Sequence, residues 1–381
     1  MDENQISPIT PDIPVTATPP QSVAPPPKSR KKLWLLMAVI VLISAAAAFW
    51  LLNHHTHTQQ PVSQTSHTKT STAPSATLAT TQGLKLDPNK NYGNKYANGL
   101  LPVGDGKYTT TSAKQGYVYA CSTYAQSLSS GQGGAGTRGP WFTDNNTVYD
   151  INKEVHVAGS VAWHGSFSDI INSDNRIITT NDLPNHVTGI FPIAATDPAY
   201  AYDRNPNSLA AQNLTYTLSA NPIYGSPQCM GGEAGVMLTG VALFNAFDAG
   251  GRDAGAWEVQ DQCGGHPQRS HEYHYHTLSS CISDTSVSTV IGFALDGFPI
   301  TGPKVSQSNI LTTADLDECH GIVSTVNLDG KKVTTYHYVM TQDFPYSVSC
   351  FRAKPSPTGP SAGGQQTGPP ANQLGPPPRR Q

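Results

Sequence analysis

The hydrophobic pattern of the chain is dominated by one long apolar run, Leu33 to Leu52, which contains no charged residue. About 20 residues at 1.5 Å rise are enough to span the roughly 30 Å hydrocarbon core of a bilayer. Trp34 and Trp50 lie near its ends, as is common for residues at the membrane interface. The run therefore predicts a single transmembrane helix over residues 33–52.

Charges next to this run predict its orientation. Four cations precede it directly: Lys28, Arg30, Lys31 and Lys32. By the positive-inside rule, residues 1–32 stay in the cytoplasm and everything after the helix is extracytoplasmic. We expect a single-pass protein of the cell membrane. A cleaved signal peptide is the alternative, because Ala45–Ala48 offers small residues to a peptidase.

Composition divides the remainder of the chain. The N-terminal residues are rich in proline and poor in large apolar side chains, so they cannot bury enough surface to fold. We expect a disordered cytoplasmic N-terminus over 1–32, a flexible Ser/Thr/His-rich linker over 53–85, and a disordered Pro/Gly-rich tail over 353–381. Residues 86–352 remain as one folded extracytoplasmic domain.

Within residues 86–352, short β-branched and aromatic runs alternate with clusters of Gly, Asn, Asp and Pro, a pattern typical of a mostly β fold with few short helices. The clearest strand candidates are Gly116–Ala120, Thr147–Ile151, Val155–Val161 and Thr215–Leu218. One short helix is predicted over Thr312–Glu318, because a capping-box-like Thr precedes an acid three residues later. The architecture we expect is sandwich-like, or a pair of duplicated β-hairpin sheets.

A repeated order of motifs suggests that duplication. Gly240–Leu243 is echoed by Gly292–Leu295, and each is followed by a turn, a cysteine, a Tyr-His-Tyr strand and a second cysteine. The two Tyr-His-Tyr strands begin at Tyr273 and Tyr336. We therefore predict two copies of one unit, at about 236–281 and 290–350.

Charge limits the choice of partners. Residues 86–352 contain 14 Lys and Arg against 23 Asp and Glu, which gives the domain a net charge of −9. Nucleic-acid phosphates require a basic face, so a nucleic-acid partner is excluded. The membrane is the expected partner of the apolar helix, and a small-molecule or surface ligand stays open for the domain.

All six cysteines lie in the folded domain, and an even number in an exported protein favours disulfides. Six cysteines allow 15 pairings. Proximity in sequence suggests Cys263–Cys281 and Cys319–Cys350, which leaves Cys121–Cys229. A thiolate metal site is the alternative, although the chain has no Cys-x-x-Cys pair to support it.

Histidines on the two Tyr-His-Tyr strands are the strongest candidate site. His274 and His276 share one face of a strand, and two such imidazoles can bind one ion. If the two repeats pack together, His337 becomes a third ligand, and His266 and His320 can complete the set. Imidazole ligands favour zinc or copper. A buried, hydrogen-bonded Tyr/His ladder without metal is the structural alternative.

Catalysis would require an acid or base near such a metal. Glu258, Asp261 and Glu272 are the candidates, because they are close in sequence to the first histidine strand. His156, His164 and His186 are expected to be hydrogen-bonded structural residues, and His271 a solvent-facing loop residue. The chain has no serine-hydrolase elbow, no His-Glu-x-x-His and no dinucleotide-binding fingerprint.

Several motifs together resemble the YHYH family of exported bacterial proteins. They are Cys263–Gln268, Tyr273–His276, Leu295–Ile300, Gly251–Ala254 with Glu258–Asp261, and Leu183–His186. The resemblance covers about residues 150–352 and implies an exported domain, but no reaction. The second repeat departs from the motif, because Val339 stands where a fourth strand histidine is expected.

Two classes of function fit these observations. The first is a surface-displayed binding module that holds a metal or a ligand on its Tyr/His face. The second is a metal-dependent enzyme, oxidative with copper and hydrolytic with zinc. A purely structural envelope domain is the third interpretation if no metal binds.

Overall fold

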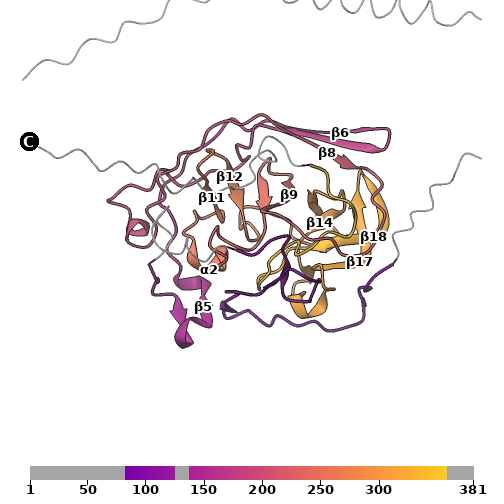
Figure 1. Ribbon diagram of the computed structural model, residues 1–381, viewed down its shortest axis with the longest axis horizontal. Helices are drawn as coiled ribbons and strands as arrows, with labels where there is room; N and C mark the ends of the chain where they lie inside the picture. The colour runs from indigo at the N-terminus through magenta and orange to yellow at the C-terminus, as the bar shows by residue number, and fades with distance from the viewer. Residues whose placement is uncertain (1–81, 125–136, 358–381) are drawn as a thin grey trace, which may run out of the picture. The chain divides into compact units, whose positions relative to one another are not determined.

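A computed structural model describes residues 82–124 and 137–357 of the chain (Figure 1). The expected transmembrane helix over 33–52 and the cytoplasmic N-terminus lie outside these residues, as do most of the linker and of the C-terminal tail. Within the two described ranges, no helix is both long and apolar enough to cross a membrane.

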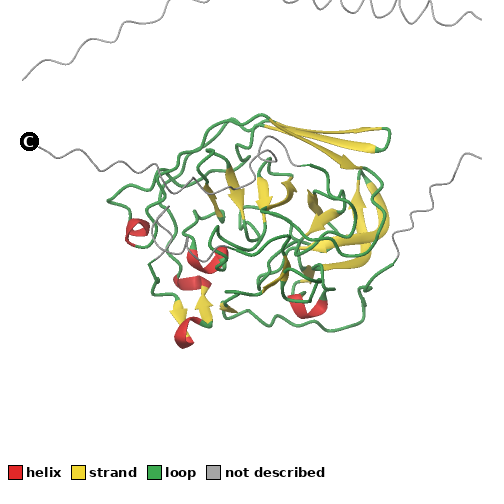
Figure 2. Cartoon of the chain, viewed as in Figure 1, coloured by secondary structure: helices red, strands yellow, loops and turns green. Residues whose placement is uncertain are grey.

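Most of the regular secondary structure in the described part is strand, as the sequence predicts, and long loops connect the strands (Figure 2). The strands are β1 (Leu100–Pro102), β2 (Tyr108–Thr109), β3 (Val118–Tyr119), β4 (Phe142–Thr143), β5 (Val148–Asp150), β6 (Phe167–Asn172), β7 (Asn175–Thr180), β8 (Leu214–Ser219), β9 (Glu233–Met237), β10 (Ala242–Phe244), β11 (Gly265–Pro267), β12 (Tyr273–Tyr275), β13 (Val290–Ala294), β14 (Pro299–Thr301), β15 (Lys304–Ser306), β16 (Asn309–Ile310), β17 (Gly321–Leu328) and β18 (Lys331–Val339). The helices are short: η2 (Asp144–Asn146), η3 (Ile151–Lys153), η4 (Pro198–Ala201), α2 (Ala254–Trp257) and η5 (Thr313–Asp315).

An eight-stranded mixed sheet forms the centre, in the order β11-β12-β10-β9-β13-β14-β18-β17. The parallel and antiparallel pairings are mirrored about the antiparallel β9–β13 pair, and each strand runs opposite to its counterpart in the other half. β10–β12 and β14–β18 are parallel, whereas β11–β12 and β17–β18 are antiparallel. Figure 1 shows β11 and β12 on one side of β9, with β14, β18 and β17 on the other.

The central strands are buried on both faces. In β9 and β13 every residue after the first is buried, which explains why these positions are all apolar or glycine rather than alternating with polar residues. A separate sheet, β6-β7-β8, contributes Ile178, Tyr216 and Leu218 to the same hydrophobic core. The histidine strands thus lie in the interior of the domain.

The strand predictions are mostly confirmed. Gly116–Ala120, Thr147–Ile151 and Thr215–Leu218 contain or overlap β3, β5 and β8. The prediction over Val155–Val161 is wrong, since only isolated bridges form there, at Val157 and Val161. Gly159 has a φ of 107° in that segment, which interrupts the extended conformation.

The predicted helix over Thr312–Glu318 is shorter in the structure. Its capping box is present, since the Thr312 N–H donates to the Asp315 carboxylate, but η5 ends at Asp315. The Asp317 carboxylate accepts hydrogen bonds from the backbone N–H groups of Cys319 and Gly321, which turns the chain instead of continuing the helix.

The alignment of Gly240–Leu243 with Gly292–Leu295 is also wrong. Gly240 ends the β9–β10 turn and is followed by β10, whereas Gly292 lies inside β13. In the mirrored sheet the counterpart of Gly240 is Gly297, in the β13–β14 turn. Both glycines have left-handed φ values, 89° and 91°, which other residues rarely adopt.

All three expected disulfides are present, Cys121–Cys229, Cys263–Cys281 and Cys319–Cys350. Ordered chain continues slightly beyond the expected domain boundaries. Lys85 bridges to Val323, and the Ser356 N–H donates to the Leu295 carbonyl oxygen.

Candidate metal centre

Three buried histidines converge at the β11–β12 end of the sheet. His266 in β11 lies directly opposite His274 in β12, because the two strands pair antiparallel in that register. His276 follows the end of β12 and shares the face of His274 two residues earlier. The ring centroids are 4.6 Å apart for His266–His274 and 4.9 Å for His274–His276.

One ring nitrogen from each histidine lies within 4.8 Å of the other two. The Nε2 atoms of His274 and His276 are 3.1 Å apart. His276 Nδ1 lies 2.5 Å from the Asn245 carbonyl oxygen, so Nδ1–H donates there and the Nε2 lone pair faces the cluster. Neither ring nitrogen of His266 has a hydrogen-bond partner. Buried polar atoms without partners are uncommon, which makes this cluster a candidate ligand site.

Burial keeps these imidazoles neutral. Loss of hydration lowers the pKa of His266 to about 3 and that of His276 to about 4, and it holds the pKa of His274 well below its usual value. A neutral imidazole is the form that binds a metal ion. At neutral pH the three imidazoles are therefore in the form that a metal ligand requires.

A carboxylate completes the surroundings of the cluster. Glu258 follows α2, and its Oε2 lies 3.4 Å from His266 Nε2 and 3.3 Å from His276 Nε2. These contacts are close, but they lack hydrogen-bond geometry, since Oε2 has no partner. Burial raises the pKa of Glu258 well above its usual value, with Asp248 adding to the effect.

On the other side of the cluster, the Phe244 ring packs against His274 with centroids 4.3 Å apart. No sequence pattern predicts that Phe244 and Asn245 lie beside these histidines. Both lie at the end of β10, the parallel neighbour of β12, and only the sheet order reveals that contact.

His337 does not join the cluster, contrary to the sequence-based expectation. Its strand β18 is separated from β12 by β10, β9, β13 and β14, which at about 4.8 Å per strand puts the two strands roughly 24 Å apart. Both ring nitrogens of His337 have partners, Thr301 Oγ1 at 2.9 Å and Ser324 Oγ at 2.7 Å. It is a satisfied structural histidine.

His320 is likewise absent from the cluster. Its Nε2 lies 3.0 Å from Thr341 Oγ1, and its backbone has a left-handed φ of 72° in the turn before β17. The reason for both errors is the same. The two Tyr-His-Tyr strands lie on opposite sides of the β9–β13 pair instead of facing each other.

Two of the three candidate acids have structural roles. Asp261 accepts hydrogen bonds from the Gly189 N–H, the Cys263 N–H and the Tyr273 hydroxyl, so its carboxylate organises the turn before β11. Glu272 interacts with the Gln268 side chain in the turn between β11 and β12. Glu258 is the candidate acid that contacts the histidine cluster.

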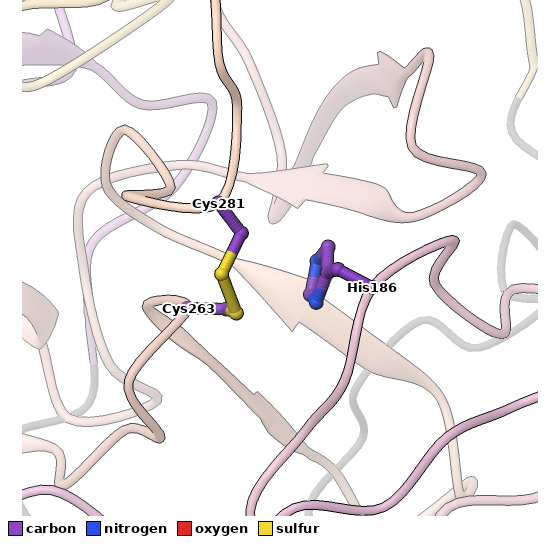
Figure 3. Close-up of side chains that lie close together, drawn as sticks. All are labelled: His186, Cys263 and Cys281. Carbon is purple, nitrogen blue, oxygen red and sulfur yellow. A yellow bond between two sulfur atoms is a disulfide. The ribbon is translucent and has the colours of Figure 1, made fainter.

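A second group gathers on the opposite face of β12. His186 lies beside the Cys263–Cys281 disulfide (Figure 3), and one ligand atom from each of the three residues falls within 4.8 Å of the others. The sulfur atoms are used in the disulfide, and His186 Nε2 pairs with the Tyr275 hydroxyl. We interpret this group as packing around the disulfide. His156, His164 and His271 are exposed.

The fold and the site thus define a disulfide-bonded β protein with a buried histidine cluster. The model of the family described as YHYH protein matches residues 215–310, which confirms the expected resemblance and shows that the chain carries a YHYH domain. The match is shorter than the expected 150–352, but it includes His266, His274 and His276. No curated protein and no solved structure matches the chain.

Proposed function

We propose that this is a membrane-anchored extracytoplasmic metal-binding protein, whose YHYH domain binds zinc or copper through His266, His274 and His276. The observation that supports the proposal is the convergence of three neutral, buried imidazoles whose ligand atoms lie within 4.8 Å of one another. His266 in particular has two unpartnered ring nitrogens in the interior, which is costly unless a ligand satisfies at least one of them.

Metal content of the full chain tests this proposal. The protein is purified without a His tag, exposed to zinc or copper, dialysed and analysed by elemental mass spectrometry beside His274→Gln and His276→Gln. We expect one ion per chain in the wild type and loss of the ion in both variants. His164→Gln, an exposed histidine, is the matched control and should retain the ion. A wild type that binds neither metal contradicts the proposal.

A metal-dependent enzyme is the second candidate, oxidative with copper or hydrolytic with zinc. One observation favours it: Glu258 also lines a small pocket together with Trp141, Glu154, His156 and Gln260. A metal with an open coordination position next to such a pocket would bind an added anion such as azide, which a closed site would not.

A metal-free structural role is the third candidate. The 3.1 Å separation of the two Nε2 atoms of His274 and His276 is also compatible with a hydrogen bond between them. If this role is correct, the wild type binds no ion under the conditions above, and substitution of either histidine affects stability alone.

We also propose the membrane location. The uncharged run over 33–52, with its preceding cations, supports a single helix with a cytoplasmic N-terminus, and the three disulfides fit an oxidising compartment. Protease treatment of intact cells should digest the domain while leaving the N-terminus protected. Release of the protein by alkaline carbonate would contradict the anchor.

Finally, we propose that about 236–281 and 290–350 are copies of one unit. The mirrored strand order supports this, and so do matching details. The Tyr273 hydroxyl donates to Asp261 as the Tyr336 hydroxyl donates to Asp317. In this alignment His266, His274 and His276 correspond to Ile322, His337 and Val339, so only the first copy has a complete histidine cluster.

A further inference from the structure

Glu258 is held in place from both sides along the chain. Its backbone N–H donates to the Ala254 carbonyl oxygen at 3.0 Å and so ends the α2 turn. Three residues later, Asp261 forms a bridge with Val157. The backbone on both sides of Glu258 is therefore held by hydrogen-bonded contacts of the fold.

The distances from Glu258 to two of the histidines match those between neighbouring ligands of a tetrahedral metal. In a tetrahedron with metal–ligand bonds of about 2.0 Å, neighbouring ligand atoms are about 3.3 Å apart. Three of the six separations between the four candidate ligand atoms match this value, whereas Glu258 contacts His266 and His276 but not His274. A tetrahedral site therefore requires one of these side chains to rotate toward the ion. Glu258 Oε2 lies 3.4 Å from His266 Nε2 and 3.3 Å from His276 Nε2, and the Nε2 atoms of His274 and His276 are 3.1 Å apart.

Unpartnered atoms are found at the same place. Glu258 Oε2 and His266 Nε2 are both buried without hydrogen-bond partners, although they lie next to each other. An unpaired buried carboxyl oxygen costs free energy, and a cation between the two atoms would satisfy both. A direct Glu–His hydrogen bond would satisfy them too, but the geometry does not form one.

We propose that Glu258 is the fourth ligand of a closed, tetrahedral zinc centre whose other ligands are His266, His274 and His276. This inference rests on the metal-binding function proposed above and adds a ligand, a geometry and a metal to it. Four protein ligands in a tetrahedron are typical of structural zinc sites, whereas a catalytic zinc keeps one position for water. Copper(II) prefers tetragonal geometry, so the arrangement favours zinc.

Glu258 is also the ligand nearest to solvent. Its side chain is 17 % exposed, compared with 5 % for His266 and 4 % for His276, and it borders the pocket lined by Glu154, His156 and Gln260. Removing this carboxylate should therefore open a coordination position on the pocket side, where a small anion can reach the metal.

Azide binding to cobalt-loaded protein tests the fourth ligand, because cobalt(II) replaces zinc and reports its coordination in the visible spectrum. The full chain is compared with Glu258→Ala, Glu258→Gln and the control Glu154→Gln, which changes a pocket residue outside the proposed ligands. We expect no azide response in the wild type and in the control, and a saturable spectral change in Glu258→Ala. Zinc affinity, measured by competition with a chromophoric chelator, should fall at least about tenfold in both Glu258 variants.

Two outcomes overturn the inference while leaving metal binding intact: an azide response in the wild type, or wild-type zinc affinity in both Glu258 variants. Absence of metal in the wild type would instead overturn the proposed function itself. Glu258→Gln keeps the size of the side chain, so its affinity decides the question if Glu258→Ala does not fold.

Discussion

Ile322 lies directly opposite His337 across the antiparallel β17–β18 pair, just as His266 lies opposite His274 across β11–β12. Val339 follows His337 by two residues, as His276 follows His274. The backbone positions of His266, His274 and His276 thus have counterparts in the second half of the sheet, where one is a histidine and the other two are apolar residues.

This relationship predicts that Ile322→His with Val339→His creates a second metal site. Without metal the double variant should be less stable by about 2 kcal/mol or more, because two imidazoles replace apolar side chains that pack with Leu311 and Leu316. With zinc present, part of that stability should return and the metal content should rise to two ions per chain. Ile322→Leu with Val339→Ile is the control. One ion per chain in the double histidine variant would contradict the proposed equivalence of the two halves.

The Cys263–Cys281 disulfide should support metal binding more than the other two. It closes a short loop that contains all three histidines of the cluster, with a sequence separation of 18. Cys263→Ser with Cys281→Ser should lower the free energy of unfolding by about 3 kcal/mol and also weaken zinc affinity. Removal of Cys121–Cys229, which spans 108 residues, should lower stability without this direct effect on affinity. Equal zinc affinities in the two variants would contradict the prediction.

Gly265 allows β11 to approach the Tyr273 ring. A Cβ atom at this position would lie 2.3 Å from the Tyr273 Cζ atom, which is closer than atoms can pack. Gly265→Ala should therefore cost about 1–3 kcal/mol of stability, measured by chemical unfolding. Gly231 is the matched control, because a Cβ atom added there would meet nothing within 4 Å. Gly231→Ala should change stability by less than about 1 kcal/mol. Similar losses for both variants would show that the close approach is not the cause.

Asp253 should make the domain less stable as the pH rises from about 4 to about 7. Burial raises its pKa from 3.8 to about 7 in the folded protein, whereas its hydrogen bonds to Tyr346 and Gly104 oppose the rise. Between these values the unfolded chain loses the proton and the folded chain keeps it, so unfolding becomes easier by about 1.4 kcal/mol for each pKa unit. Asp253→Asn should flatten this dependence, as urea unfolding at a series of pH values would show. An unchanged slope in Asp253→Asn would contradict the prediction.

The features of the site that the sequence predicts depend on residues close together in the chain. The features that it does not predict depend on contacts between distant segments. Strand periodicity predicts that His274 and His276 share one face, and the short spacing of Cys263 and Cys281 is enough to pair them. The wrong assignment of His337 depended on how two halves pack, which local patterns do not contain. Its proximity in sequence to the histidine strand makes Glu258 a candidate base. Its contact with two histidines, however, depends on where α2 lies relative to β11 and β12.

The predicted alignment of the two proposed repeat units is wrong for a related reason. Gly240–Leu243 and Gly292–Leu295 look alike because buried strands and the turns beside them draw on the same small set of residues. The hydrogen-bond pattern distinguishes them: the Met237 N–H donates to Val241 and the Ala294 N–H to Phe298, which aligns the two turns. Sequence similarity between short apolar runs was a weaker guide than backbone pairing.

Strands β9 to β12 occur one after another in the sequence, before any strand of the other half. Every neighbour that the histidine cluster needs within the sheet is therefore synthesised before β13. Loops that close over short separations cost little entropy and form quickly. If the domain is exported and binds an ion as proposed, the cluster can assemble and take up that ion while the C-terminal half of the domain is still emerging, and the ion would be in place before the rest of the sheet pairs with β9.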